Sequence, residues 1–190
     1  MDKILLIGGG GHCKAAIDVI EQSKTFQIYG IIDIKKKLGQ EILGYKIIGT
    51  DDDLPEFRNI TPNALITVGH IYENTKRVDL YKKLTQLNYK LPSIVSPLAY
   101  VSKHAEISEG VIVMHYAMVN AGAKIGINCI LNARSLVEHD ASIGNHTHIS
   151  TGSIVNGGTT IGDHSFIGSA TVTKEYTKIK GFYKAGRVLK

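Results

Sequence analysis

The chain has 190 residues, 43% of them hydrophobic, and carries a formal net charge of +5 at neutral pH. This length allows one or two small domains, and no aliphatic run is long enough to cross a membrane. The positive charge favours anionic partners, but Trp is absent and there is no arginine-rich stripe, so we expect phosphorylated small molecules rather than nucleic acid.

Cysteine content and the start of the chain bear on the compartment. Cys13 and Cys129 are the only cysteines. The N-terminus lacks a signal-peptide pattern, because Asp2 and Lys3 lead straight into an apolar run. We therefore expect no disulfide framework, no membrane association and a cytoplasmic, reducing environment.

The first expected elements are a strand, a glycine turn and a helix. The apolar run Lys3–Ile7 predicts a buried parallel strand, and Gly8–Gly11 is followed by apolar residues at helical spacing up to Ser23. Together they form the first half of a nucleotide-binding βαβ unit, because glycines let the backbone approach phosphate and a helix N-terminus offers free N–H groups. We therefore assign Gly10 and Gly11 to substrate binding.

The glycine pattern is incomplete. Gly8 and Gly10 fit the dinucleotide fingerprint, but Cys13 occupies its third glycine position. A tight turn without a ligand is the alternative interpretation. A full dinucleotide-binding fold also needs more chain than the roughly 90 residues that precede the second half, so we expect half a Rossmann fold that holds one nucleotide.

Two further strands are expected to end near this turn. The strand predicted at Ile28–Ile32 ends in Asp33, the usual place for an acid that accepts hydrogen bonds from a ribose or a base. The strand predicted at Ala64–Val68 ends at Gly69, beside the glycine turn if the sheet is parallel. The candidate substrate-binding residues at this edge are Asp33, Ile34, Gly69 and His70.

The rest of this half is predicted more coarsely. In order, we expect a solvated loop at Lys35–Lys37, a short strand at Ile47–Ile48, a short helix at Asp51–Phe57, an amphipathic helix at Asn74–Leu87 and a connection at Pro92–Pro97. The predicted domains are therefore an α/β domain at residues 1–92 and a second domain at 93–190.

The second domain is organised by a six-residue repeat. Every sixth residue is aliphatic, and a smaller residue stands two positions before each aliphatic one. The aliphatic positions are Val101, Ile107, Val113, Val119, Ile125, Leu131, Val137, Ile143, Ile149, Val155, Ile161 and Ile167.

A fixed period of six fits neither a helix nor a half-buried strand, and it is the signature of a hexapeptide parallel β-helix. Each unit supplies one short strand and a corner, and three units close one triangular coil whose inside holds the aliphatic side chains. Stacked coils lie about 4.8 Å apart and pair their backbones as parallel strands.

The combination of both halves resembles a known family. A small nucleotide-binding domain that opens with a strand and Gly10-Gly11-His12, followed directly by a hexapeptide β-helix, is similar to the bacterial sugar acetyltransferases of the sialic-acid and bacillosamine pathways. The resemblance implies a left-handed β-helix, a homotrimer, and acetyl-CoA in the groove between neighbouring β-helices. It further implies that the first domain holds a nucleotide-linked amino sugar of the 4-amino-4,6-dideoxy type, whose amine is acetylated for surface polysaccharide or glycan synthesis without a metal.

The resemblance also assigns residue roles. The stretch from Asn132 to Gly144 matches the family's catalytic segment, which makes His139 the base and places Asn132 near the acceptor. Glu138 or Asp140 would orient the imidazole and stabilise its protonated form. The remaining assignments are His12 in the nucleotide site, and His148, Gly157, Lys184 and Arg187 in the acetyl-CoA site.

The spacing of two histidines favours an oligomer independently of the family. His139 and His148 are nine residues apart, half of an 18-residue coil, so they should lie on opposite sides of one prism. One chain cannot easily bring both into one pocket, whereas two chains packed side by side can. We therefore expect active sites between protomers.

Three alternatives remain open at this point. The acceptor could be a sugar hydroxyl, as in sialic-acid O-acetylation. A zinc-dependent hydrase could use the same prism, with His139, His146 and His148 as ligands. The chain could also bind a nucleotide sugar without catalysis.

Overall fold

The computed structural model describes all residues, 1–190, and divides the chain into two compact units. The first comprises Met1–Gly69 and Thr75–Pro92, and the second comprises His70–Asn74 and Ser93–Lys190. The sequence placed His70–Asn74 in the first domain, but these residues pack with the second unit. Their contacts lie far away in the sequence, so no local pattern indicates them.

The first unit is built on a five-stranded sheet of order β3-β4-β2-β1-β5. Strands β1, β2, β4 and β5 run parallel, and β3 pairs antiparallel with β4. The bounds are β1 Asp2–Ile7, β2 Phe26–Ile32, β3 Glu41–Ile42, β4 Tyr45–Gly49 and β5 Asn63–Ile66. Strand β1 lies in the centre of the sheet's parallel part, which explains why the run from Ile4 to Ile7 is fully buried.

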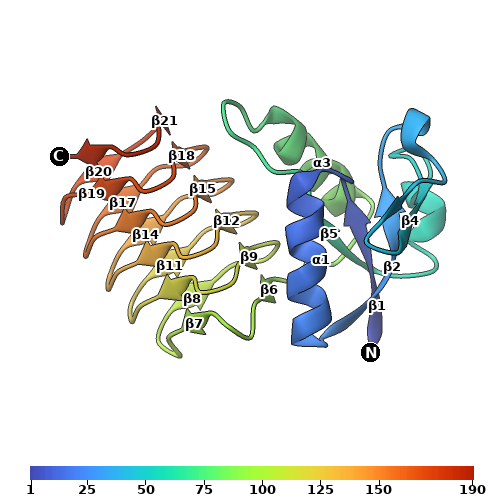
Figure 1. Cartoon of the computed structure of the whole chain (residues 1–190), viewed down its shortest axis with the longest axis horizontal. Coiled ribbons are helices and arrows are strands. Elements are labelled where there is room, and N and C mark those ends of the chain that lie inside the picture. Colours follow the sequence, from blue (N-terminus) through green and yellow to red (C-terminus); the bar gives the residue numbers. More distant parts are fainter. The chain divides into compact units, whose positions relative to one another are not determined.

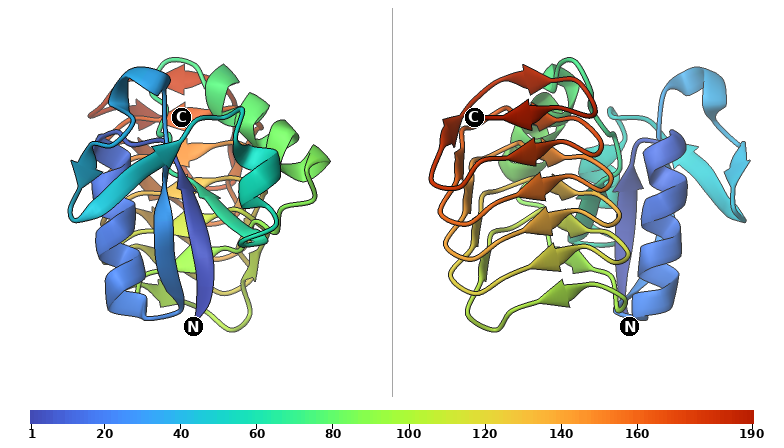
Figure 2. Two further views of the ribbon diagram at one scale, coloured as in Figure 1. Left: turned by 90° about the vertical axis from the view of Figure 1, so that its right-hand side faces the viewer. Right: turned by 60° about the vertical axis from the view of Figure 1, so that its left-hand side comes forward.

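Helices cover both faces of this sheet. The helices are α1 Gly11–Ser23, α2 Leu54–Phe57 and α3 Thr75–Gln86. Alternate β1 residues Leu5 and Ile7 join one core cluster with Leu54 of α2 and Leu80 of α3, whereas the buried side of α1 lies outside that cluster. Figure 2 shows α1 running alongside β1 and β2.

Two details of this unit differ from expectation. Lys35–Lys37 is not an open loop but one turn of 3-10 helix, η1, and Lys37 pairs with Asp33. The predicted strand at Ile47–Ile48 is longer and forms a hairpin with β3, which carries too few apolar residues to be recognised from periodicity. Both contacts are local: Lys37 pairs with Asp33 four residues before it, and the hairpin is closed by a turn at Leu43 and Gly44, which both have positive φ.

The second unit is a left-handed parallel β-helix whose two-residue strands form three sheets, named here after the three strands of one coil. Figure 1 shows the coils stacked along one axis. The β13 face contains β7 Tyr100–Val101, β10 Met118–Val119, β13 Leu136–Val137, β16 Ile154–Val155, β19 Val172–Thr173 and β22 Val188–Leu189. The β14 face contains β8 Glu106–Ile107, β11 Lys124–Ile125, β14 Ser142–Ile143, β17 Thr160–Ile161 and β20 Lys178–Ile179. The β15 face contains β6 Ile94–Val95, β9 Ile112–Val113, β12 Ile130–Leu131, β15 His148–Ile149, β18 Phe166–Ile167 and β21 Phe182–Tyr183.

Burial follows the six-residue repeat. Residues paired across neighbouring coils are 18 positions apart, as Met118 with Leu136 and Ile130 with His148. The repeated aliphatics and the small residues two positions before them form one core cluster inside the prism. The first strand residue of each unit points outward, so the chemistry of each face is read from one residue per coil.

Most corners contain a residue in the left-handed conformation, three positions after an inward-facing residue. Glycine occupies several of these positions, as Gly122, Gly152 and Gly158, but Asp140 (φ 58) and Tyr176 (φ 52) adopt the same conformation. From Val101 to Ile179 the repeat thus continues without an insertion.

The repeat extends beyond the predicted positions and is interrupted near its end. Strand β6 pairs with β9 at the 18-residue spacing, so the coils begin six residues before Val101. In the last coil Phe166 pairs with Phe182 and Val172 with Val188, a spacing of 16, because only three residues separate Ile179 from Tyr183. Gly181 (φ +119) allows this shortened corner.

No helix combines the length and apolar character needed to span a bilayer. The longest, α1, has 13 residues.

Candidate functional site

The corner between β13 and β14, residues Glu138–Ala141, carries the predicted base. His139 and Asp140 project from this corner with side chains that are 56% and 71% exposed. The left-handed backbone of Asp140 closes the turn and brings its carboxylate beside the neighbouring imidazole. We call this segment the His139 corner.

A hydrogen bond orients the imidazole. Nδ1 of His139 lies 2.9 Å from Oδ2 of Asp140, and because a carboxylate only accepts, Nδ1 carries the proton. In the neutral ring Nε2 is then the basic nitrogen. The hydrogen bond that Nδ1 of His139 donates to Asp140 is the main reason why the pKa of His139 lies above its ordinary value. Desolvation opposes this rise, and the charges of Asp140 and Glu138 add to it.

Glu138 has a different role from Asp140. Its Oε2 accepts a hydrogen bond of 2.7 Å from Nδ2 of Asn120, one coil away, and one of 3.3 Å from the backbone N–H of His139. It makes no hydrogen bond to the imidazole ring. Of the two acids that the sequence left open, Asp140 is therefore the one that contacts the ring.

Small residues in the adjoining coils leave room around His139. Gly157 lies one coil further along, and a Cβ at that position would stand 2.7 Å from Nε2 of His139. Gly122, one coil before Asp140, would likewise collide with the Asp140 carboxylate if it carried a Cβ. The backbone N–H of Gly157, a buried residue, donates to no group of the chain. The residue that lies against the basic nitrogen thus carries an unused donor.

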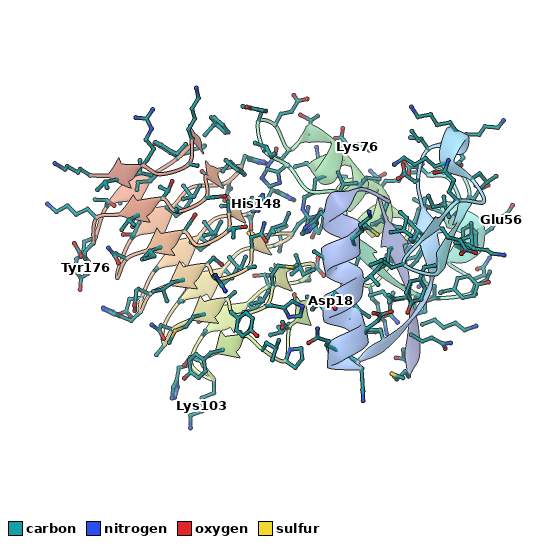
Figure 3. All side chains as sticks on the ribbon, in the orientation of Figure 1. Asp18, Glu56, Lys76, Lys103, His148 and Tyr176 are labelled. Carbon is teal, nitrogen blue, oxygen red and sulfur yellow. The ribbon has the colours of Figure 1, made fainter.

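Tyr176 is a corner residue beside Gly158 that sequence reasoning missed. Its side chain is 76% exposed, yet its ring packs on Gly158, the residue after Gly157. Figure 3 shows Tyr176 on the far side of the β-helix from His148. The 18-residue spacing that joins Asp140, Gly158 and Tyr176 at one corner was the signal that could have identified it.

A second polar group surrounds His148 on the β15 face. Nδ1 of His148 lies 2.8 Å from the carbonyl oxygen of His70, and Nε2 lies 3.2 Å from Nδ2 of Asn132. His148 is only 6% exposed, in contrast to the exposed position expected of a residue that contacts acetyl-CoA. The structure thus brings together Asn132, His70 and His148, but not His148 and His139.

The glycine turn after β1 is held by long-range contacts. Gly8 has φ +108, and a Cβ there would overlap Val68, which follows β5. Gly69 lies against the Cβ of His12, so the ends of β1 and β5 meet at the turn as predicted. Gly10 is the N-cap of α1 and no side chain caps this helix, which leaves its first turn available to an anion.

Asp33 ties the end of β2 to this turn. Its carboxylate accepts hydrogen bonds of 2.7 Å from the N–H groups of Gly9 and Ile34, and one of 2.8 Å from Nζ of Lys37. Burial alone would raise the pKa of Asp33, but these hydrogen bonds outweigh it and the pKa lies below its ordinary value. Three donors already surround the carboxylate, so its structural role is clear, while contact with a ribose or base stays a prediction.

A cavity of about 350 Å³ opens at the carboxyl ends of the parallel strands in the first unit. This is where open α/β sheets bind their ligands. Of the predicted substrate residues, Asp33 and Ile34 line the cavity, whereas Gly10, Gly11, His12, Gly69 and His70 do not. The lining residues are Ile7, Gly8, Ile32, Asp33, Ile34, Lys35, Thr50, Asp51, Asp52, Val68, Lys76 and Leu80.

The basic residues near the C-terminus lie at a different corner from His139. Lys184 and Arg187 are exposed and sit between β21 and β22, at the corner that Asn132 occupies three coils earlier. Within one chain they are therefore separated from His139 by the width of the β13 face. No group of three or more His, Cys, Asp or Glu side chains is arranged to hold a metal ion.

The chain resembles known proteins in both units. Residues 3–84 match the PglD N-terminal domain family. A UDP-N-acetylbacillosamine N-acetyltransferase of Bacillus subtilis is 27% identical over 117 residues, which are 60% of this chain and 52% of that protein. The chain thus matches about half the length of this curated relative.

Solved structures extend the likeness to the whole chain. The acetyltransferase domain of PglB from Neisseria gonorrhoeae is 29% identical, with a TM-score of 0.90 over 100% of this chain and 92% of that one. The same domain in complex with acetyl coenzyme A is 28% identical, with a TM-score of 0.87 over 98% of this chain and 92% of that one. PerB from Caulobacter crescentus, in complex with CoA and GDP-perosamine, is 24% identical, with a TM-score of 0.76 over 94% of this chain and 92% of that one. This is a likeness of fold.

Proposed function

We propose that this chain, which resembles the hexapeptide-repeat sugar acetyltransferases of the PglD type, transfers the acetyl group of acetyl-CoA to the amine of a nucleotide-linked amino sugar. The observation that carries this proposal is the exposed His139, oriented by Asp140 and lying beside the unused N–H of Gly157. These are the base, the orienting acid and the oxyanion donor that acyl transfer needs.

The chemistry at His139 follows from its tautomer. Nε2 of His139 accepts a proton from the attacking amine as nitrogen bonds to the thioester carbonyl carbon. The tetrahedral intermediate then collapses, the carbon–sulfur bond breaks, and the imidazolium returns the proton to the CoA thiolate. Asp140 keeps Nδ1 protonated and stabilises the imidazolium.

Gly157 supports the same step. Negative charge develops on the thioester oxygen in the transition state, and an N–H already in place stabilises it without reorganisation. Gly157 is buried, a Cβ on it would stand 2.7 Å from Nε2 of His139, and its N–H donates to no group of the chain. It is thus our candidate donor to the oxyanion, and the missing side chain keeps the approach open.

We assign the nucleotide of the substrate to the cavity of the α/β unit. Asp33 and Ile34 line it together with two cations, Lys35 and Lys76, which suit a nucleoside diphosphate. Gly10, Gly11 and His12 would contribute the first turn of α1 for phosphate. Lys184 and Arg187 are proposed to meet the phosphates of CoA.

The outward residues of the β-helix support a homotrimer. On the β13 face all six are apolar: Tyr100, Met118, Leu136, Ile154, Val172 and Val188. On the β14 face all five are polar: Glu106, Lys124, Ser142, Thr160 and Lys178. Burial against the same face of another copy would remove this apolar stripe from water. Three copies packed through their β13 faces would place the His139 corner of one chain against a neighbour.

One coil offers a matched test of this assembly. Ile154→Glu puts a charge on the β13 face, and Thr160→Glu puts the same charge on the β14 face. We expect Ile154→Glu to dissociate the trimer and reduce activity, and Thr160→Glu to change neither, as measured by light scattering and acetyl transfer. A fully active monomer would contradict active sites between protomers.

The activity itself is tested by a substrate screen. UDP-, dTDP- and GDP-linked 4-amino sugars are incubated with acetyl-CoA, and the free thiol of CoA is measured. We expect thiol release with at least one amino sugar and none from the corresponding hydroxy sugar. Release only with hydroxyl acceptors would assign O-acetylation, and no release with any acceptor would leave a binding protein.

A further inference from the structure

The hydrogen bonds around His148 point to a role that differs from contact with acetyl-CoA. We propose that His148 is a positioning residue, which fixes the side-chain amide of Asn132 so that its remaining N–H is presented to an oxygen of the acceptor sugar. This inference rests on the proposed function for the identity of the acceptor. The assignment of hydrogen-bond donors and acceptors around His148 does not depend on the proposed function.

The first bond sets the tautomer of His148. Its Nδ1 lies 2.8 Å from the carbonyl oxygen of His70, and a carbonyl oxygen only accepts hydrogen bonds. Nδ1 of His148 therefore carries a proton. In the neutral ring Nε2 is then an acceptor.

The second bond joins His148 to Asn132, with Asn132 as the donor. Nε2 of His148 lies 3.2 Å from Nδ2 of Asn132, which is a donor. The two atoms are complementary only if Nε2 is unprotonated. A protonated Nε2 would instead place two donors against each other, so the arrangement selects neutral His148.

The third bond prevents the amide from turning over. Oδ1 of Asn132 accepts the backbone N–H of Ala133 at 2.8 Å. A rotated amide would direct an NH₂ group at that N–H and lose both contacts at once. The three bonds are therefore satisfied by one assignment only, which runs from the His70 carbonyl through His148 to Asn132.

Packing holds the ring of His148 in this arrangement. The rings of His70 and Phe166 lie edge-on to it, with centroids 5.3 Å and 5.1 Å away. His148 is 6% exposed, and Figure 3 places it on the opposite side of the prism from Tyr176, which shares a corner position with Asp140. Its two ring nitrogens are engaged, so it is suited to orient a neighbour rather than to bind a substrate.

The fixed amide belongs to Asn132, which is partly exposed and can therefore meet a ligand. Of the two hydrogens on Nδ2, one points to His148 and one is left for a ligand. Asn132 would thus act as a hydrogen-bond donor toward an acceptor oxygen. A turned amide would present a second acceptor there and reject the same group.

The tautomer can be measured without any activity. Two-bond ¹H–¹⁵N correlation spectra of histidine-labelled protein at neutral pH report which ring nitrogen carries the proton, and His148→Asn assigns the signal. We expect neutral His148 protonated at Nδ1. A ring protonated at Nε2, or at both nitrogens, would overturn the proposal.

Two near-isosteric variants separate positioning from simple structural support. His148→Gln can place an acceptor oxygen near the position of Nε2, whereas His148→Asn keeps the contact with the His70 carbonyl and loses the contact with Asn132. We expect KM for the amino sugar to rise about tenfold in His148→Asn and much less in His148→Gln. Equal effects of both variants, with equal loss of thermal stability, would indicate a structural role only and overturn the proposal.

Asn132→Ala supplies the coupling test. We expect its rise in KM for the sugar to match that of His148→Asn, with the double variant no worse than either, and KM for acetyl-CoA unchanged. A rise in KM for acetyl-CoA in His148→Asn would show contact with the co-substrate and contradict the proposal. If the native protein transfers acetyl to no amino sugar while His148 is protonated at Nδ1, the proposed function fails and the hydrogen-bond assignment stands.

Discussion

His139 and His148 belong to the same coil but have opposite environments. His139 stands at a corner with a side chain that is 56% exposed and glycines in the adjoining coil, whereas His148 is 6% exposed between two aromatic rings. The ring of His139 has one partner, Asp140, and keeps Nε2 available, while both nitrogens of His148 are engaged. A corner therefore suits a group that exchanges protons, and a covered face suits a group that holds another in place.

The largest expected effect comes from His139. His139→Ala removes the proposed base, so kcat for acetyl transfer should fall about 10²- to 10⁴-fold. The circular dichroism spectrum and oligomeric state should be unchanged, because the side chain lies outside the core. Full activity of His139→Ala would end its assignment as base and the contrast with His148.

Gly157→Ala should have the next largest effect. The new Cβ would stand 2.7 Å from Nε2 of His139 and force the ring aside, which we expect to reduce kcat about 100-fold. Gly162→Ala is the matched control, since its Cβ meets only the flexible side chain of Lys180. Equal kinetics for both variants would contradict the placement of His139 against Gly157.

Asp140→Asn should reduce kcat about tenfold and shift its pH dependence. Asp140 raises the pKa of His139, and the base form is lost as pH falls through that raised pKa. Without the Asp140 charge the pKa falls, so the acidic limb of the kcat profile should move to lower pH. Glu138→Gln should move it less, because Glu138 acts on the ring only through its charge. A larger shift in Glu138→Gln would reverse the two roles.

The smallest effect concerns the α/β unit. Asp33→Asn weakens the contacts that join β2 to the glycine turn, so the free energy of unfolding should fall by about 1–3 kcal/mol at neutral pH. Since the folded-state pKa of Asp33 is lowered, this difference is present above the unfolded pKa of about 3.9 and disappears as pH falls through the folded pKa. Urea denaturation at several pH values measures it. KM for the sugar should rise and KM for acetyl-CoA should not, and the reverse result would remove Asp33 from the nucleotide site.

The repeat made much of the β-helix predictable. Corner geometry and core packing recur every six residues, so the inward aliphatics and the corner position of His139 follow from counting along the chain. The same count would have found Tyr176, had it been applied to corner positions as well as to the core. The shortened last coil was not foreseen, because the periodic signal ends near Ile167 and the new register depends on Gly181.

The α/β unit was predicted less completely. Strand β1, the glycine turn and α1 were recognised because an apolar run, glycines and helical spacing are local signals. The β3–β4 hairpin and the pairing of Lys37 with Asp33 were missed although both are local, because β3 has only two residues and three consecutive lysines read as an exposed loop.

By itself, the sequence determined the six-residue unit, the half-coil separation of His139 from His148 and the strand–glycine–helix opening, because each follows from the geometry of adjacent residues. Only the tertiary structure decided that Asp140 rather than Glu138 contacts the His139 ring, and that Asp33 holds the N–H of Gly9, 24 residues away. It also decided that His148 donates to the carbonyl of His70, 78 residues away in the chain. The pairings of Asp33 and His148 are fixed by where distant segments come to lie, and the choice of Asp140 is fixed by the left-handed backbone of its corner, so no local spacing contains that information.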